Sequence, residues 1–483
     1  MPLYNFETHI KILMISKLKN TLKKSILHLV DLYGQNHTGR IKTSPDPKIW
    51  GHSISNNGTL VIGDIDIDQL VKEYGTPLHV VDKNQLEQTY TQFKESFSSH
   101  YSKIEIAYSY KTNPLPTVIK KLHTFGADAE VISHFELWLA LHLGVPSKKI
   151  VFNGPGKSIE SLQLAVEKKI KIINIDSSDE ITLIAKLAKQ NNTIQAVGIR
   201  LITSVGWAGQ FGLPIATGMA WQAITEIKGQ SNLNLIGLHL HLGTGIKDVS
   251  IYLQAIDEAL EFATRLKKEA EINIKYIDLW GGFSISTVSP YSGLDHHLMS
   301  AGFPPWLPDF SAPSTQSEDA KRIMDKIKEY YDPSTPESPT FVFEPGRALT
   351  GKSQLLLLKV LTIKPAANGE INIILDGGRN IIMPPTWEHH AVLPASKMNT
   401  KKGHYYNIYG PLCHPGDMLF QGRWMPELEV GDIVAIMDTG AYFIPNQMNF
   451  SNPRTAVVIV DGDEVKVARK RERFEDIVSL DSF

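Results

Sequence analysis

From about residue 76 to residue 350, short apolar runs rich in β-branched residues alternate with stretches in which apolar residues recur at helical spacing. The stretches 162–169 and 252–268 are two of these helical patterns. Strands that alternate with helices in this way predict a parallel sheet. The strand candidates lie at 78–82, 104–111, 129–133, 150–154, 171–176, 196–201, 235–242, 276–280 and 341–343.

The number of strands indicates how the sheet closes. If the run 78–82 only leads into the domain, eight strands remain, which is the number in a (β/α)8 barrel of the TIM type. An open, doubly wound sheet is the alternative, but no early strand is followed by Gly-x-Gly-x-x-Gly. We therefore predict a barrel over 76–350 with an insert near 284–332, in which a Pro- and Ser-rich loop at 289–317 precedes a helix at 318–331.

The regions on either side of the barrel have other patterns. After residue 350 the chain has β-rich runs, Gly and Pro turns and no long helical pattern, which predicts a β-sandwich or barrel domain over 351–483. Residues 49–75 are expected to form strands that join this β domain. Residues 1–48 are expected to be a helical extension, because lysines alternate with apolar residues at helical spacing over 9–33. Such a helix could dock on a subunit or lie weakly on a membrane surface.

Composition excludes several functional classes. The 483 residues are 42% hydrophobic and carry a formal net charge of -2, so nothing indicates a nucleic-acid partner. No apolar run reaches 18 residues, so no membrane span is expected. Cys413 is the only cysteine, which rules out an intramolecular disulfide and fits a reducing, cytoplasmic location.

Lys111 ends the apolar strand-like run 104–111. Burying an ammonium costs several kcal/mol unless something compensates it. One compensation is chemical, because a desolvated lysine has a lowered pKa and can form a Schiff base with the aldehyde of pyridoxal 5'-phosphate (PLP). Taken alone, Lys111 is more often a strand-end lysine whose ammonium reaches water.

The ends of other predicted strands change that balance. In a barrel, the active residues lie at the carboxyl ends of different strands. Arg347, a hydroxyl and glycine turns could hold the phosphate of PLP, a carboxylate could keep the pyridine nitrogen protonated, and a flat ring could stack on the cofactor. The residues at these strand ends that have the required chemistry are His241, Thr244, Gly281, Gly282 and Glu344.

Several motifs occur in an order known from one family. With them, the chain resembles the fold-type III PLP-dependent decarboxylases of the alanine-racemase-like barrel, nearest to the diaminopimelate decarboxylases. The group also contains ornithine and arginine decarboxylases. The matching motifs are Ala107-Tyr-Ser-Tyr-Lys111-Thr-Asn113, His241-Leu-Gly-Thr-Gly245, Gly281-Gly282-Phe283, Glu344-Pro-Gly-Arg347, Gly410-Pro-Leu-Cys413-x-x-Gly-Asp417 and Gly440-Ala-Tyr442.

The resemblance implies roles for these residues. Lys111 would carry PLP, and Glu344 would pair with the pyridinium nitrogen. His241 would stack on the ring, and Arg347 and Tyr442 would help to bind the phosphate. The resemblance also implies a homodimer with shared active sites, in which Cys413 reaches into the partner's site and protonates the α-carbon.

Two departures from the family concern the far end of the substrate. Diaminopimelate decarboxylases have a glutamate where this chain has His414, and an arginine for the distal carboxylate where it has Met383. With Tyr442, these are the predicted substrate-binding residues. We hypothesise an α-decarboxylase of an L- or meso-amino acid with a different distal group, such as a non-standard amino acid or a carrier-linked aminoacyl conjugate of secondary metabolism.

Other functions remain open at this stage. The alternatives are a meso-diaminopimelate decarboxylase of lysine biosynthesis and a PLP-dependent amino-acid racemase; a PLP-binding protein without activity is a further possibility. Glu344 and Cys413 favour decarboxylation, since alanine racemases pair the pyridine nitrogen with an arginine. No metal is expected, because the histidines near Glu388 match no standard ligand spacing.

Overall fold

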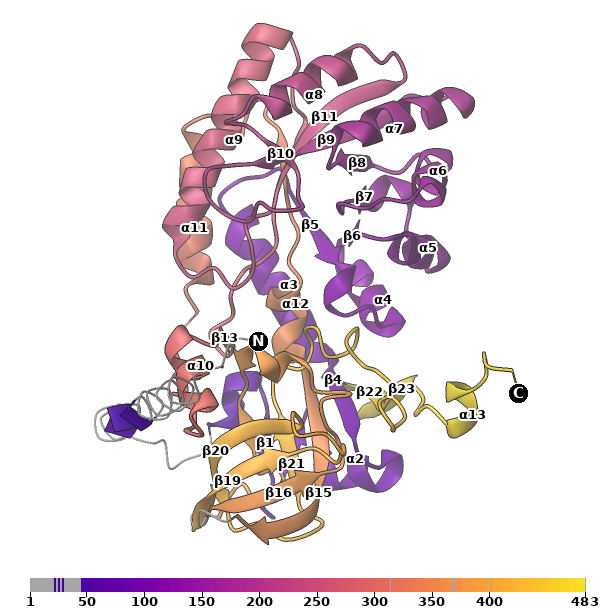
Figure 1. The fold of residues 1–483 in the computed structure, drawn as a ribbon. Coiled ribbons are helices and arrows are strands. Elements are labelled where there is room, and N and C mark those ends of the chain that lie inside the picture. Colours follow the sequence, from indigo (N-terminus) through magenta and orange to yellow (C-terminus); the bar gives the residue numbers. More distant parts are fainter. Residues whose placement is uncertain are drawn as a thin grey trace, which may run out of the picture.

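The computed structural model describes residues 21–22, 25–26, 28–29, 45–312, 314–366, 370–400 and 402–482. Most of the predicted helix at 9–33 and of the extension 1–48 lies outside these residues, and the six described residues before residue 45 are helical. From residue 45 onward, a barrel lies above a β domain in the view of Figure 1. No helix of the described ranges has the length and apolarity needed to cross a bilayer.

The upper part is a closed barrel of eight parallel strands, as predicted. The strands follow the order β9-β11-β12-β14-β5-β6-β7-β8, and β8 pairs with β9 to close the ring. Most of their side chains are buried, which explains why the sequence shows continuous apolar runs rather than alternation. The strands are β5 (Ile104–Ser109), β6 (Asp128–Val131), β7 (Ile150–Phe152), β8 (Ile172–Ile175), β9 (Gln195–Ile202), β11 (Leu233–Leu240), β12 (Tyr276–Leu279) and β14 (Thr340–Phe343), with β10 (Leu213–Pro214) beside β9.

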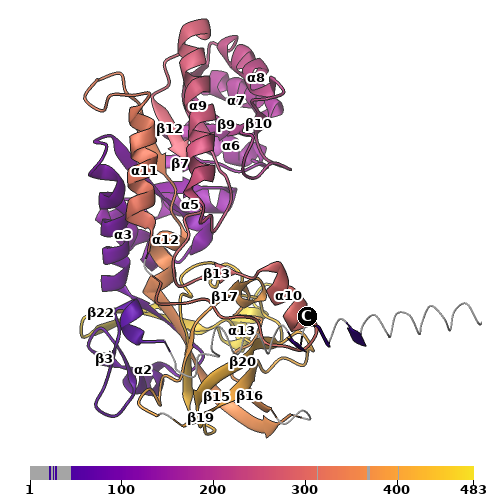
Figure 2. The same ribbon diagram turned by 90° about the vertical axis from the view of Figure 1, so that its left-hand side faces the viewer.

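Helices surround this barrel, and Figure 2 shows three of them, α3, α9 and α11, along one side. Helix α3 comes before the first barrel strand rather than after the last. Serine N-caps fix the start of several helices; Ser133 and Ser158, for example, accept backbone N–H groups of the first turn. The helices are α3 (Lys83–Ser98), α4 (Pro116–Phe125), α5 (His134–His142), α6 (Ile159–Glu167), α7 (Ser178–Gln190), α8 (Met219–Lys228), α9 (Val249–Ala270) and α11 (Gln316–Lys328).

The strand β4 (Leu78–Asp82) belongs to the lower domain, which corrects the predicted start of the barrel at residue 76. It pairs with β15 (Gln354–Pro365) on one side and with β22 (Ala456–Asp461) on the other. The barrel portion therefore begins with α3. An apolar strand has the same sequence pattern in either sheet, so the pattern alone could not show which domain contains β4.

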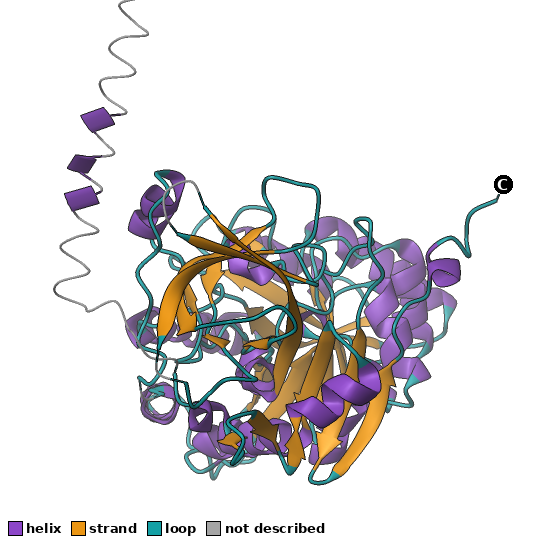
Figure 3. Ribbon diagram, turned by 90° about the horizontal axis from the view of Figure 1, so that it is seen from below, coloured by secondary structure: helices purple, strands orange, loops and turns teal. Residues whose placement is uncertain are grey.

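The lower domain is built around the long strand β15. Neighbouring residues of β15 face two different cores, with Leu355 and Leu357 in one and Leu356 and Leu358 in the other, because side chains alternate along a strand. Figure 3, seen from below, shows the strands of this domain. The other strands of the domain are β16 (Ile371–Leu375), β18 (Val392–Leu393), β19 (Gly403–Tyr409), β20 (Met418–Pro426), β21 (Ile433–Ile436), β22 and β23 (Glu464–Arg469).

The segment 49–75 packs on this domain. It contains a small sheet of β1 (Ser53–Ile54), β2 (Leu60–Ile62) and β3 (Ile65–Asp66), followed by helix α2 (Ile67–Tyr74). Leu60 and Leu70 share a core with residues of β15. The Leu60 N–H also donates to the Ala395 carbonyl at 2.8 Å, which ties the segment to the β domain.

The insert is more ordered than its Pro- and Ser-rich composition suggests. The predicted loop 289–317 contains the helix α10 (Gly293–Ser300), whose start is fixed by a capping box between Ser292 and Asp295. It also contains β13 (Ser289–Pro290), which pairs with β17 (Glu388–His389) beside the β domain. Short-range capping and a long-range strand pair thus order a segment that lacks a hydrophobic period.

Candidate active site

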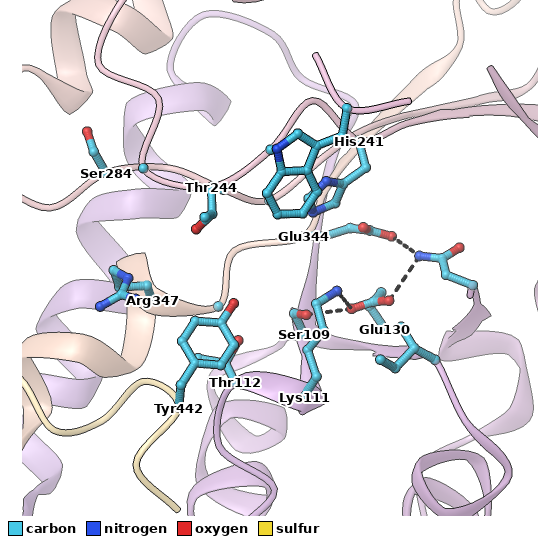
Figure 4. A pocket seen from close by; sticks show the side chains of 18 of the residues that line it. Ser109, Lys111, Thr112, Glu130, His241, Thr244, Ser284, Glu344, Arg347 and Tyr442 are labelled. Atoms are coloured by element: carbon cyan, nitrogen blue, oxygen red, sulfur yellow. Dashed lines mark hydrogen bonds and ion pairs between the residues drawn. The ribbon is translucent and has the colours of Figure 1, made fainter. Parts of the chain in front are cut away.

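A cavity of about 450 Å³ lies at the carboxyl ends of the barrel strands. Residues of β5, β6, β9 and β11 line it, together with residues that directly follow β7, β12 and β14. Trp387, Glu388 and Tyr442 reach it from outside the barrel, and Figure 4 shows Tyr442 beside Lys111. The structure therefore brings together most of the predicted site residues. The predicted residues that line the cavity are Lys111, His241, Thr244, Gly281, Gly282, Glu344, Arg347 and Tyr442.

Lys111 follows β5 in a short 3-10 turn, and its Nζ lies 3.5 Å from Oε2 of Glu130. Burial would lower the pKa of Lys111, but the carboxylates of Glu130 and Glu344 raise it above its ordinary value. The lowered pKa expected from desolvation is therefore wrong for this structure. Lys111 is held as an ammonium, and Glu130 is the nearest group to take its proton before the amine can attack an aldehyde.

A hydrogen-bond network joins Glu130 to Glu344. Nδ2 of Asn153 donates to Oε1 of Glu130 at 3.1 Å and to Oε1 of Glu344 at 2.6 Å. Nδ2 of Asn174 donates to the side-chain Oδ1 of Asn153 at 2.8 Å, which fixes the orientation of the Asn153 amide. The Ser109 hydroxyl donates to Glu130 at 2.6 Å. The two carboxylates are thereby held in fixed orientations on one side of the cavity.

Glu344 also has an unused acceptor. Its Oε2 has no hydrogen-bond partner among the described residues, although Nε2 of His239 lies 3.6 Å away. Burial and the neighbouring Glu344 raise the pKa of Asp278 well above its usual range, so Asp278 carries a proton. Burial would raise the pKa of Glu344 too, but His239, Asp278 and Lys111 bring it well below its usual range, so Glu344 is ionised. An ionised, partly unsatisfied carboxylate is suited to a pyridinium N–H.

Ligand atoms of His239, Asp278 and Glu344 lie within 4.8 Å of one another. Among the described residues, these three are close enough together to hold a metal ion. The histidines next to Glu388 do not belong to this group, because each contacts a carboxylate elsewhere. His390 contacts Glu388, and His389 contacts Asp295.

His241 lines the cavity with a ring that stays neutral. Burial, together with the positive charge of Lys111, lowers the pKa of His241 to about 3. The indole of Trp207 stacks near it, with ring centroids 5.7 Å apart and planes at 29°. A neutral ring backed by an indole can lie flat against an aromatic cofactor without adding charge.

Glycines shape the side of the cavity around Thr244. Gly282 has φ +72°, and a Cβ there would lie 2.0 Å from the Gly243 carbonyl oxygen. A Cβ on Gly281 would lie 2.2 Å from the Glu344 carbonyl oxygen. Only glycine fits at both positions. Figure 4 shows Thr244, Ser284, Arg347 and Tyr442 grouped on this side, away from Glu130 and Glu344, and these hydroxyl and N–H donors suit a phosphate.

Arg347 already has a carboxylate partner. Its two terminal nitrogens donate to Glu388, from Nη1 to Oε1 at 3.1 Å and from Nη2 to Oε2 at 2.8 Å. The Tyr442 ring lies 5.4 Å from the guanidinium carbon. The predicted contact of Arg347 with a phosphate stays a prediction, and both ends of its fork are already occupied by Glu388.

Three predicted residues do not line this cavity. Cys413 and His414 are exposed in a turn of the β domain, and Met383 is half-buried outside the cavity lining. Asp417 shapes the cysteine turn by accepting the N–H groups of Leu412 and Arg379 at 2.8 and 2.7 Å. Within a single chain, Cys413 therefore does not reach this cavity.

Several site residues were missed in the sequence. Asn153 lies at the end of the predicted strand 150–154, so the rule that selected Lys111 could have found it. Glu130 is the second residue of the predicted strand 129–133, and only the observed bounds of β6 place it near a carboxyl end. His239 stands two residues before His241, and so on the same side of its strand. Glu388 gave no such signal, because it is brought to the cavity by the pairing of β17 with the insert.

A (β/α)8 barrel with a lysine at a strand end, an ionised carboxylate facing the same cavity and glycine turns beside hydroxyls is the arrangement of a PLP enzyme. The family described as "Pyridoxal-dependent decarboxylase, pyridoxal binding domain" matches residues 83–351. The chain belongs to this family. It is thus a PLP-dependent amino-acid decarboxylase, which confirms the predicted enzyme class and cofactor and does not support the racemase alternative.

Individual relatives agree with this assignment. The chain is 30% identical to diaminopimelate decarboxylase of Methanocaldococcus jannaschii over 443 residues, which cover 88% of this chain and 95% of that protein. It is 29% identical to the Bacillus subtilis diaminopimelate decarboxylase over 441 residues, covering 88% and 96%. The crystal structure of the M. jannaschii enzyme superposes with a TM-score of 0.80 at 28% identity, covering 89% of this chain and 98% of that one.

Proposed function

We propose that Lys111 carries PLP in this cavity and that the chain removes the α-carboxylate of an amino acid bound there. When bound, PLP supplies an electron sink for the pair released by the breaking C–C bond. The observation that carries the assignment is the ionised Glu344, which lines the same cavity as Lys111. Glu344 would keep the ring nitrogen protonated, and His241 would lie against the ring face.

The other residues would bind and orient. Thr244 and Ser284 would donate to the phosphate together with N–H groups of the glycine turns at Gly281 and Gly282, with Tyr442 alongside. Glu130 would accept the proton that Lys111 gives up and return it when the product leaves. Decarboxylation and cofactor binding are tested by CO2 release and by the visible absorbance of lysine-bound PLP, with Lys111→Ala as the blank for both.

The α-carbon needs a proton after CO2 leaves. We propose that Cys413 of a second subunit delivers it, so that the enzyme is a homodimer with shared sites. Cys413→Ala and Lys111→Ala should each be inactive as decarboxylases, while mixed subunits should regain activity through hybrid dimers with one intact site. A mixture that stays inactive although exchange is demonstrated would refute the shared site.

The two departures from the family motifs bear on the substrate. We propose a non-standard amino acid or an aminoacyl conjugate, because Met383 and His414 stand where diaminopimelate decarboxylases have an arginine and a glutamate. Within a single chain neither residue lines the cavity. The cavity also shares Ser284 and Ile285 with a neighbouring cavity of about 320 Å³ under the insert, which gives room for a larger group. The names of the relatives support the alternative, meso-diaminopimelate.

An amine-release screen over amino acids and conjugates separates these substrates. High kcat/KM on meso-diaminopimelate, above that for every conjugate tested, would favour the alternative and overturn the non-standard substrate.

A further inference from the structure

The strongly basic side chains among the described residues that line the active-site cavity are all paired. Lys111 contacts Glu130 at 3.5 Å, and Arg200 contacts Asp176 at 3.5 Å. Arg347 is paired with Glu388 at 2.8 Å. In the described lining of the cavity, each guanidinium and ammonium therefore already has a carboxylate partner. None of them is left unpaired for an additional anion.

The pair of Arg347 and Glu388 is the tightest of the three. It is bidentate, and the two side chains are only 10% and 6% exposed. A bidentate pair combines charge with matched geometry, and removal of one partner leaves the other as an uncompensated buried charge. Burial would raise the pKa of Glu388, but Arg347 and His390 lower it, so the carboxylate stays ionised.

The position of Glu388 is fixed by the backbone and by a second side chain. Glu388 pairs with Pro290 in the β13–β17 ladder, and the Tyr291 N–H donates to the Trp387 carbonyl at 2.9 Å. His390 lies 3.0 Å from Oε1 of Glu388 and, on its other side, 2.9 Å from the Met437 carbonyl. Glu388 is thus built into the cavity wall and cannot swing aside as a surface side chain would.

We propose that Glu388 determines substrate charge: it occupies Arg347 from within the chain and so excludes amino acids whose side chain ends in a carboxylate. Such a carboxylate would meet the negative Glu388 at close range, and the two N–H donors of Arg347 that Glu388 accepts are not available to it. The site then selects amino acids with a neutral or cationic distal end, including amides and esters of acidic side chains. This inference rests on the proposed decarboxylase function and narrows its substrate class.

The test compares substrates that differ only in the distal group. The PLP-loaded enzyme is assayed for CO2 release from L-glutamine against L-glutamate and from L-lysine against meso-diaminopimelate. In both pairs the substrate without the distal carboxylate should have a kcat/KM at least about tenfold higher. A preference of the wild-type enzyme for the carboxylate in both pairs would overturn the inference, and this comparison needs no variant.

Two variants test whether the substrate preference arises from the ion pair of Arg347 and Glu388. Glu388→Gln keeps the shape and removes the charge, so it should shift both ratios at least about tenfold toward the carboxylate, through a lower KM. Adding Arg347→Gln should abolish that shift. Glu167→Gln, on the exposed end of α6, is the matched control and should leave the ratios unchanged. A folded, PLP-loaded Glu388→Gln enzyme with wild-type ratios would refute the role of Glu388.

Failure of the proposed function gives a different result. If the PLP-loaded enzyme releases CO2 from no amino acid or conjugate, the decarboxylase proposal fails. The charge preference is then measured as binding, from the change in cofactor absorbance when each member of a pair is added. Tighter binding of the carboxylate member would still overturn the inference, and weaker binding would support it.

Discussion

Replacing Asn153 by alanine should disturb both carboxylates of the active site at once. Its amide nitrogen donates to Glu130 and to Glu344, and all three side chains are buried. A hydrogen bond to a charged group contributes about 1.5–3 kcal/mol, so the variant loses about 3–6 kcal/mol of favourable interaction. Water that enters the space of the lost side chain would recover part of it.

In this variant the carboxylates of Glu130 and Glu344 should lose their orientation but keep their negative charge. One pKa unit corresponds to about 1.4 kcal/mol, so losing its bond to Asn153 raises the pKa of Glu344 by about one to two units. Because that pKa starts well below its usual range, Glu344 stays ionised at neutral pH. If about half of the lost energy is expressed in the transition state, kcat/KM falls about 10- to 150-fold.

The assay is CO2 release by PLP-loaded enzyme, with cofactor absorbance and thermal unfolding measured alongside. Asn153→Asp should be more harmful than Asn153→Ala, because it places a third carboxylate between Glu130 and Glu344. Asn234→Ala, on an exposed position of β11, is the control. If folded Asn153→Ala enzyme keeps its kcat/KM within about twofold, the amide does not orient the two carboxylates.

Two further predictions concern a turn and a buried histidine. Gly282→Ala should lower the free energy of unfolding by about 2–4 kcal/mol and weaken PLP binding, because its Cβ would overlap the Gly243 carbonyl oxygen at positive φ. Gly293→Ala is the control and should have little effect, since no atom lies within 4 Å of the added Cβ. Equal unfolding midpoints and PLP affinities for the two variants would contradict this prediction. Burial, with the charge of Arg469, lowers the pKa of His79 to about 3. Between pH 6.5 and 3, His79 is protonated in the unfolded chain but neutral in the folded protein. The free energy of unfolding therefore falls by up to about 1.4 kcal/mol per pH unit as the pH drops from 6.5 toward 3. His79→Gln should remove that part of the slope in urea titrations, and an unchanged slope would show that another group carries it.

The barrel and the centre of the site were predictable because both depend on local patterns. Strand-like runs alternating with helical ones specify a parallel barrel, and parallel strands end on the same face. That geometry alone brings Lys111, His241 and Glu344 to one cavity. Glycine turns were recognisable too, since close backbone approach leaves no room for a side chain.

The charge of Lys111 could not be predicted from local patterns. The strand-like run predicted that its ammonium would be desolvated, and desolvation by itself lowers the pKa of a lysine. The opposite shift arises from Glu130 and Glu344, which come from different strands. The sign of the shift depends on distances between these charges, and the linear sequence does not contain those distances.

The sequence by itself determined the barrel, the PLP chemistry and the family, because these follow from periodicity and from short motifs at strand ends. Only the tertiary structure decided that β4 belongs to the β domain, that the insert forms a strand pair with β17, and that Glu388 occupies Arg347. Each of these is a contact between segments far apart in the chain. No local pattern specifies such a partner, since an apolar strand or a charged side chain can satisfy many, and packing of the whole chain selects one.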